Sequence, residues 1–334
     1  MNGQRTRKNY ILPLKILVSL VLLSWMFRQI KWSEIVFTLS HAHLVWVTAA
    51  FGWVVVSVLV SAYKWQLILK ASSLELPFKV LWKSYWAGLF FNNFLPSSIG
   101  GDGLRIYWIG KHTQDLAGAT ASVVVERVLA TAGLCLAALL AAPFSNTVIP
   151  QLIGFFLIIL ALSSVLILLI LFPKLTEMLQ SRLNSWPKTQ RFIEGLSMHG
   201  NRLRKQPGLL VKALIGSIIF QFCVVTVNWS LFRALAVTQI TPFQAAFLIP
   251  ATSVAAMIPI GINGYGVREG AYMALFAQIG IASSVAVTVS VLFALIVSFS
   301  SLWGGWIWIK EGRRIYGKER VEIDTREPGR SLFQ

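Results

Sequence analysis

The chain has 334 residues, of which 56% are hydrophobic and 13% are charged. A soluble domain is usually about one-quarter charged, so this composition excludes an ordinary soluble protein and predicts an integral membrane protein. The formal net charge of +17 predicts no nucleic-acid partner, because the positive residues gather in loops and tails beside apolar segments, as the positive-inside rule requires.

The first apolar segment, residues 11–27, follows a basic start and predicts a membrane-spanning helix. The segment resembles a signal peptide, but no small-residue cleavage site follows it and the rest of the chain is also apolar. We therefore interpret it as an uncleaved helix with a cytoplasmic N-terminus. A second span is predicted at about 44–69, and Lys64 and Lys70 near its end place that end at the cytoplasmic face.

Residues 78–116 predict a hairpin that enters the membrane from the cytoplasmic side and leaves on the same side. Its first apolar run, 78–95, ends before Pro96, because a residue that precedes proline avoids the α-helical region. The glycines that follow allow a tight turn or a close backbone approach, and an apolar pattern resumes at Leu104.

Further full spans are predicted at about 117–142, 148–172, 209–236 and 282–309. The loop 173–208 carries seven Lys or Arg residues against two Glu, which predicts that it is cytoplasmic. Residues 243–280 predict a second hairpin, which enters from the outside because Arg268 is the only basic residue between Arg233 and Lys310. The tail from residue 311 is charged and polar, and we expect it to be flexible.

One short pattern occurs twice. Residues 96–105 and 259–268 both read P-x4-G-x-G-x-R, 163 residues apart, and the two predicted hairpins approach from opposite faces. The prediction is an all-α polytopic membrane protein with six full transmembrane helices and two re-entrant helical hairpins in an inverted repeat, an architecture typical of transporters. The expected parts are an N-terminal helix and outer connection at 1–43, repeat 1 at 44–142, a linking helix and basic loop at 143–208, repeat 2 at 209–309 and a cytoplasmic tail at 310–334. The expected hinge residues are Pro96, Gly100, Gly101, Gly103, Pro259, Gly264 and Gly266.

Non-helical backbone at membrane depth requires a protein interior or a water-filled cavity, so two glycine turns at depth predict a cavity. Surface loops between short helices are the alternative. Ionisable residues inside spans are costly and usually face an interior or a water path. The deep ionisable residues are three cations and three carboxylates: Asp102, Arg105, Glu126, Arg127, Arg268 and Glu269.

Two interpretations of these charges stay open. In the first, they form internal ion pairs that hold the hairpins together. In the second, the arginines stay free to bind an anion, because the paired N–H groups of a guanidinium and the N-terminus of a half-helix both suit phosphate. Asn92, Asn93 and Asn263 beside the turns either bind a headgroup or cap helix ends, and Tyr265 takes the place of Asp102 in the second repeat. The two cysteines and four histidines show no metal-ligand spacing, and no enzyme signature is present, so we expect a non-enzyme without a cofactor.

The chain resembles the lysylphosphatidylglycerol synthase transmembrane-region family, whose members are also called flippase-like membrane proteins. The resemblance covers about residues 10–310 and rests on Asn93-x-Leu95-Pro96, Gly100-Gly101-Asp102-Gly103-x-Arg105, Glu126-Arg127, and Pro259 with Gly264-Tyr265-Gly266-Val267-Arg268-Glu269-Gly270. It implies movement of lipids with charged or glycosylated headgroups between leaflets. Members that aminoacylate phosphatidylglycerol carry a soluble synthase domain after the membrane part. This chain ends about 25 residues after its last predicted span, so we expect the stand-alone form without lysyl transfer.

We therefore expect a lipid transporter or flippase in the plasma (inner) membrane, with multiple spans, both termini cytoplasmic and membrane lipids as partners. A polar cavity at the two broken helices would hold the headgroup. Arg105, Arg127 and Arg268 would bind its phosphate, and Asp102, Glu126 and Glu269 would orient those arginines or bind a cationic substituent or a proton. Two alternatives remain: a transporter of a small soluble anion or ion, and a non-catalytic membrane accessory whose partner is a lipid-modifying or glycosyltransferase enzyme.

Overall fold

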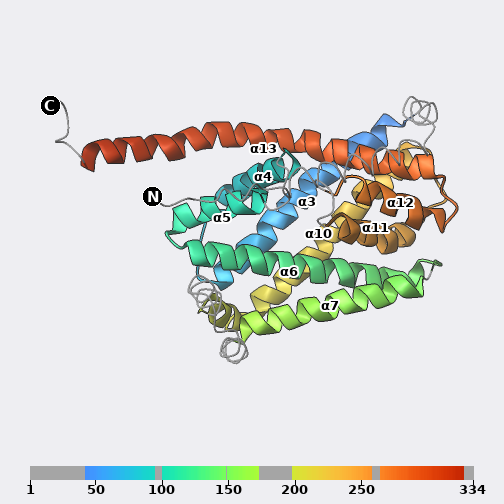
Figure 1. Cartoon of the computed structure of the whole chain (residues 1–334), viewed down its shortest axis with the longest axis horizontal. Coiled ribbons are helices and arrows are strands. Elements are labelled where there is room, and N and C mark those ends of the chain that lie inside the picture. Colours follow the sequence, from blue (N-terminus) through green and yellow to red (C-terminus); the bar gives the residue numbers. More distant parts are fainter. Residues whose placement is uncertain (1–41, 95–99, 148, 173–197, 258–263, 327–334) are drawn as a thin grey trace, which may run out of the picture.

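The computed structural model describes residues 42–94, 100–147, 149–172, 198–257 and 264–326. Within these ranges every regular element is helical, and the long helices run side by side (Figure 1). The predicted first span at 11–27, the pattern residues Pro96 and Pro259, and most of the basic loop lie outside the described residues.

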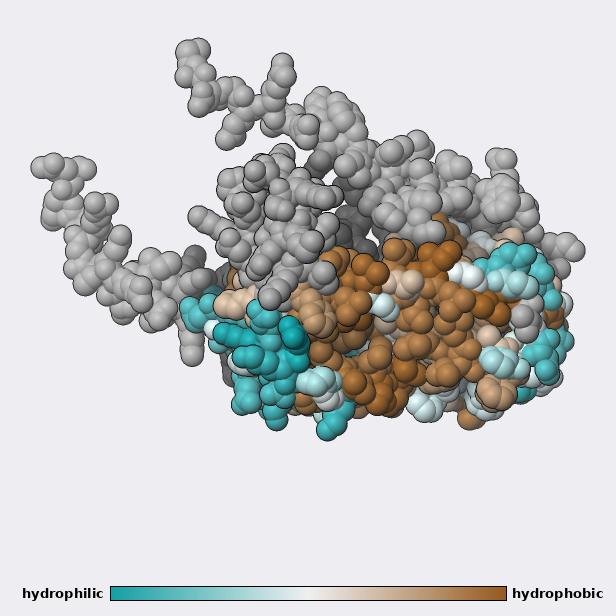
Figure 2. Space-filling model, turned by 90° about the horizontal axis from the view of Figure 1, so that it is seen from below, coloured by the Kyte–Doolittle hydropathy of each residue, from teal (hydrophilic) through white to brown (hydrophobic). Residues whose placement is uncertain are grey.

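Five helices are long and apolar enough to cross a membrane. They are α3 (Leu44–Ala71), α6 (Leu116–Ala141, continued by the short 3-10 helix η1, Ala142–Phe144), α7 (Pro150–Leu171), α10 (Pro207–Ala234) and α13 (Ser283–Arg326). Their apolar parts confirm five of the six predicted spans. Figure 2 shows the result on one face, where an apolar band separates hydrophilic surfaces at the two ends of the molecule.

Local sequence explains where these helices begin and end. Asp115 caps the start of α6 by accepting a 2.7 Å hydrogen bond from the Gly118 N–H, while Pro150 and Pro207 occupy first helical positions, where proline loses no hydrogen bond. Helix α13 continues to Arg326, so the first part of the predicted tail is helical, and its flexibility stays a prediction.

Four shorter helices form two antiparallel pairs. Helix α4 (Phe78–Phe94) packs against α5 (Gly100–Thr113), and α11 (Pro242–Met257) packs against α12 (Val267–Ala277). The longest of the four has 17 residues, which span about 25 Å and fall short of the roughly 30 Å of a bilayer core. Figure 1 shows α4 and α5 beside one end of the long helices, and α11 and α12 beside the other end.

The element order α3–α4–α5–α6 recurs as α10–α11–α12–α13. Both ends of α10 lie 163 residues after the corresponding ends of α3, the same spacing that separates the two sequence patterns. The packing also corresponds, since α3 lies against α10, α4 packs on α13 and α11 packs on α6. Exchanging the two sets of helices therefore reproduces the same set of contacts.

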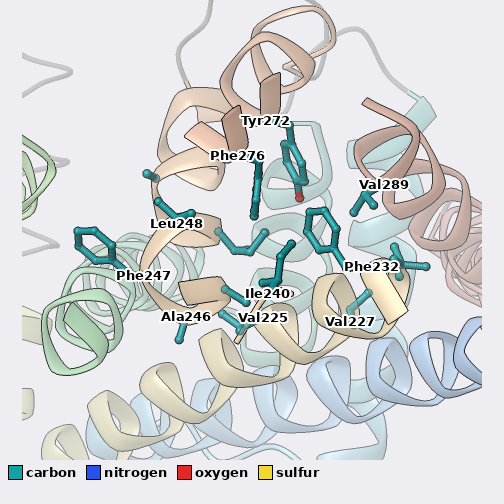
Figure 3. Packing of buried hydrophobic residues seen from close by; sticks show 14 of the residues in the cluster. Val225, Val227, Phe232, Ile240, Ala246, Phe247, Leu248, Tyr272, Phe276 and Val289 are labelled. Carbon is teal, nitrogen blue, oxygen red and sulfur yellow. The ribbon is translucent and has the colours of Figure 1, made fainter. Parts of the chain in front are cut away.

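An apolar core holds the second pair of short helices against α10 (Figure 3). The rings of Phe232 from α10 and Phe276 from α12 lie 4.7 Å apart, and Tyr272 lies 5.5 Å from Phe276. All three side chains are almost completely buried. Between helices in a membrane, close packing of such side chains provides the attraction, so these ring contacts hold α12 against α10.

One end of the molecule, which we call the basic end, collects most of the described cations. It is formed by the end of α3, the turn between α5 and α6, the end of α7 and the helical residues 198–204. The cations at this end are Lys70, Lys79, Lys83, Lys111, Arg202, Arg204, Lys205, Lys212 and Lys310. At the opposite end, the His43 N–H donates a hydrogen bond to the Ala234 carbonyl oxygen, which joins the start of α3 to the end of α10.

A buried histidine joins the parts of the basic end. His199 is fully buried against Gly118, and its Nε2 lies 3.2 Å from Asp115 Oδ2, while Arg202 donates to the Ser72 carbonyl at 3.3 Å. Burial lowers the pKa of the His199 imidazole below its ordinary value of 6.5; Arg202 acts in the same direction and Asp115 opposes both. The folded protein therefore holds a neutral His199 at neutral pH.

We expect this histidine to make the fold sensitive to mild acid. Because its pKa is lower in the folded state, the unfolded chain binds the proton more tightly. The stability due to His199 is fully present above about pH 6.5 and is lost as the pH falls below that value. Thermal unfolding of the purified protein at pH 7.5 and 5.5 should show a lower midpoint in acid, and His199→Gln should reduce that difference. An equal acid effect in the variant would contradict this assignment.

Candidate functional site

Helices α3, α5 and α6 bring five charged side chains together at one place. We call this group the charge cluster; its members are Lys64, Asp102, Arg105, Glu126 and Arg127. Glu126 is its centre, with Oε1 2.7 Å from Lys64 Nζ and Oε2 3.3 Å from Arg105 Nη1. Asp102 accepts hydrogen bonds from Nε and Nη2 of Arg127, both at 2.7 Å, and lies 3.3 Å from Arg105 Nη1.

The sequence prediction of these contacts was partly right. Four predicted residues do meet, from α5 and α6, and each arginine has a carboxylate neighbour. Lys64 was interpreted, with Lys70, as a basic residue near the cytoplasmic end of its helix, but its role in an ion pair was missed: its side chain is 1% exposed and paired with Glu126. A signal was present: Lys64 lies seven residues, or about 10 Å, before the end of α3, and a lysine at that depth needs a partner.

The interior members of the cluster are completely enclosed, whereas one edge is open. Lys64, Arg105 and Glu126 are at most 2% exposed, but the Arg127 side chain is 46% exposed. The Arg105 guanidinium lies 4.0 Å from the ring centre of Trp65 and 4.3 Å from that of Tyr85. Aromatic faces stabilise a cation electrostatically, and sequence reasoning missed both rings because they come from other helices.

A cavity of about 230 Å³ lies beside the charge cluster. Helices α3, α4, α5, α6, α10 and α13 all contribute to its wall. Both Arg105 and Arg127 line it, together with the polar side chains of Ser57, Tyr85 and Asn92. The remainder of the wall is apolar, for example Phe220 and Phe293. A pocket with an apolar wall and a few polar groups on one side is typical of a ligand site.

Close contact between α4 and α5 sets the shape of this cavity. The Gly101 N–H donates a 2.9 Å hydrogen bond to Asn92 Oδ1, and a Cβ at Gly101 would overlap the carbonyl oxygen of Gly88. Gly100, Gly101 and Gly103 were predicted to allow a tight turn or a close backbone approach. They belong to the first turn of α5, and Gly101 makes the close approach. The neighbouring Asn93 has a buried Nδ2 without a hydrogen-bond partner among the described residues.

The second repeat holds a smaller and self-contained polar group. Arg268 Nη2 lies 3.2 Å from Glu269 Oε1, and Ser290 of α13 contacts both side chains. Glu269 Oε2 also accepts from the Gly266 N–H, which caps α12. The Tyr265 ring lies 5.2 Å from the Arg268 guanidinium. Here the predicted turn is confirmed, because Gly264 and Gly266 have φ angles of 75° and 85°.

The six deep charges thus separate into two groups rather than one. Arg268 does not line the cavity beside Arg105, although the Phe293 ring lies both in the cavity wall and 5.9 Å from Arg268. Asn263, predicted beside the second turn, lies outside the described residues. Within the described parts of the chain, no cluster of His, Cys, Asp and Glu side chains could hold a metal ion.

The fold and the site define a multi-pass helical membrane protein with a charged cavity among its helices. Residues 13–304 match the family described as the lysylphosphatidylglycerol synthase transmembrane region, and the chain belongs to that family. The chain is also similar to a UPF0104 membrane protein of Pyrococcus horikoshii, with 23% identity over 341 residues that cover 92% of this chain and 98% of the relative. The resemblance inferred from the sequence motifs is therefore confirmed.

Proposed function

We propose that this protein transports a lipid, by moving a phospholipid or lipid-linked headgroup between leaflets through the cavity beside the charge cluster. The observation that carries the proposal is a cavity of about 230 Å³ within a bundle of membrane-spanning length, with two arginines in its wall. A polar headgroup cannot cross hydrocarbon unaided, because each unsatisfied polar group in that medium costs several kcal/mol. The cavity supplies charged and hydrogen-bonding partners at that depth.

The repeated helix order supports a transport role. We propose that the two sets of helices form an inverted repeat and that both pairs of short helices are re-entrant hairpins. Their equal sequence spacing, their corresponding contacts and their location at opposite ends support this. Many transporters built from inverted repeats bind their substrate beside broken helices and move by rocking one repeat against the other. In this protein the cavity lies beside the first pair, α4 and α5, and α11 and α12 do not line it.

The distribution of charge supports an orientation. The basic end would face the cytoplasm of a plasma (inner) membrane, because Lys and Arg next to membrane spans are retained on that side. In this orientation α4 and α5 enter from the cytoplasm, and both chain termini are cytoplasmic. Asn92, Arg105 and Arg127 would contact the headgroup in the cavity, while Asp102 and Glu126 orient the arginines.

Transport can be tested in liposomes that contain the purified protein and a fluorescent phospholipid. We expect lipid to exchange between leaflets faster than in empty liposomes. Arg127→Gln should slow the exchange by about 10-fold, since a hydrogen bond to a charged group contributes about 1.5–3 kcal/mol. The Arg127 side chain is 46% exposed and Asp102 keeps Arg105 as a neighbour, so the variant should fold.

Lys70→Gln is the matched control, because it removes the same charge from an exposed position outside the cavity and should leave exchange unchanged. The release of inorganic phosphate trapped inside the same liposomes is measured in parallel. Phosphate release without lipid exchange would refute lipid transport and indicate a carrier of soluble anions.

A further inference from the structure

The charge cluster contains one cation more than its carboxylates can neutralise. Lys64 pairs with Glu126 at 2.7 Å, and Arg127 pairs with Asp102 through two hydrogen bonds of 2.7 Å. These two pairs are short and direct. Arg105 shares the same two carboxylates through Nη1 alone, at 3.3 Å from each. Three cations against two carboxylates leave a net charge of +1, and the weaker contacts identify Arg105 as the surplus cation.

The described surroundings of Arg105 use only part of its hydrogen-bonding capacity. Its Nε and Nη2 are buried and have no hydrogen-bond partner among the residues that the structure describes. Buried guanidinium donors are normally all satisfied. Trp65 and Tyr85 interact with the guanidinium through their ring faces, which does not satisfy the in-plane N–H groups. A buried cation with free donors beside a cavity is an arrangement that an anionic ligand would complete.

We propose that Arg105 is the recognition group for a singly charged phosphate diester bound in the cavity. One negative charge neutralises the cluster, whereas a doubly charged phosphate monoester would leave it at −1. Arg127 and Asn92 line the same cavity and offer further donors. Guanidinium groups suit phosphate oxygens because their N–H groups are planar and paired. The site follows from the cluster itself, and only the lipid as the source of the diester rests on the proposed function.

The second repeat shows why the site belongs to the first repeat. Arg268, which corresponds to Arg105 by the 163-residue spacing, is balanced by the adjacent Glu269 and hydrogen-bonded to Ser290. It has no surplus charge and does not line the cavity. The two repeats therefore differ in chemistry: the first binds the anion, and the second is neutral without one.

The test is calorimetric titration of the purified full chain in detergent with three probes. Dihexanoyl-phosphatidylglycerol carries the diester and two short chains, glycerophosphoglycerol carries the diester without chains, and dihexanoylglycerol carries chains without phosphate. We expect binding of the first probe and none of the third. Arg105→Gln should weaken binding of the diester by about 10- to 100-fold, as expected for charged hydrogen bonds.

This variant should remain folded, because both carboxylates keep their partners and the cluster becomes neutral. Arg105→Lys, which restores the charge, should recover part of the affinity, and Lys70→Gln should leave it unchanged. If glycerophosphoglycerol binds as tightly as dihexanoyl-phosphatidylglycerol, the phosphate site is supported but its ligand is a soluble diester. Equal binding of dihexanoylglycerol, or full affinity in Arg105→Gln, would overturn the proposal. Diester binding by a protein that exchanges no lipid would refute transport and retain the site.

Discussion

Replacing Glu126 with glutamine should destabilise the folded protein by about 3–5 kcal/mol, the typical cost of removing one partner from a buried ion pair. Glu126 is 1% exposed and contacts both Lys64 and Arg105, which are equally buried. Without its carboxylate, Lys64 loses its ion-pair partner and the charge cluster rises from +1 to +2. The measurement is the unfolding midpoint and the folded fraction after purification.

The double variant Lys64→Met, Glu126→Gln provides the decisive comparison. It returns the cluster to +1, because Asp102 still pairs with Arg127 and only Arg105 remains in excess. We expect it to be more stable than Glu126→Gln alone, although it contains one more substitution. Lys64→Met alone should be milder than Glu126→Gln, since Glu126 keeps Arg105. If the two substitutions simply add, the ion pair is not what stabilises this region.

A single methyl group at Gly101 should separate α4 from α5 and abolish transport. A Cβ there would overlap the Gly88 carbonyl oxygen and lie 2.6 Å from Asn92 Oδ1. The obstacle is backbone, which cannot rotate away, so the helices must shift. Overpacking of this kind costs about 1–3 kcal/mol. The shift would also displace Asn92 and Arg105 in the cavity wall. Lipid exchange by Gly101→Ala in liposomes is the measurement.

Gly103→Ala is a close control for this prediction. Gly103 lies in the same turn of α5, is exposed, and has no atom within 4 Å of the position that a Cβ would occupy. Alanine favours helix over glycine by about 1 kcal/mol, so this variant should be as stable as the parent or slightly more stable. Similar losses in both variants would mean that helix flexibility, rather than the close approach of α4 and α5, is required.

The sequence by itself determined the membrane class, the positions of five spans and the duplicated helix order. These features depend on local properties: about 20 apolar residues are needed to cross a bilayer, and a pattern repeated at 163 residues can be read from the chain alone. It also singled out Asp102, Arg105, Glu126 and Arg127, four residues that do meet, because charged residues inside apolar segments are conspicuous.

Only the tertiary structure decided which charges meet. The partner of Glu126 is Lys64, from a helix about 60 residues earlier, and the rings around Arg105 come from α3 and α4. Such contacts depend on how each helix is rotated about its axis, and spacing along one helix does not define that rotation. The same reason explains Gly101, whose role is to let two helices touch. Packing of distant helices therefore turned three deep cations into two ion pairs and one surplus arginine.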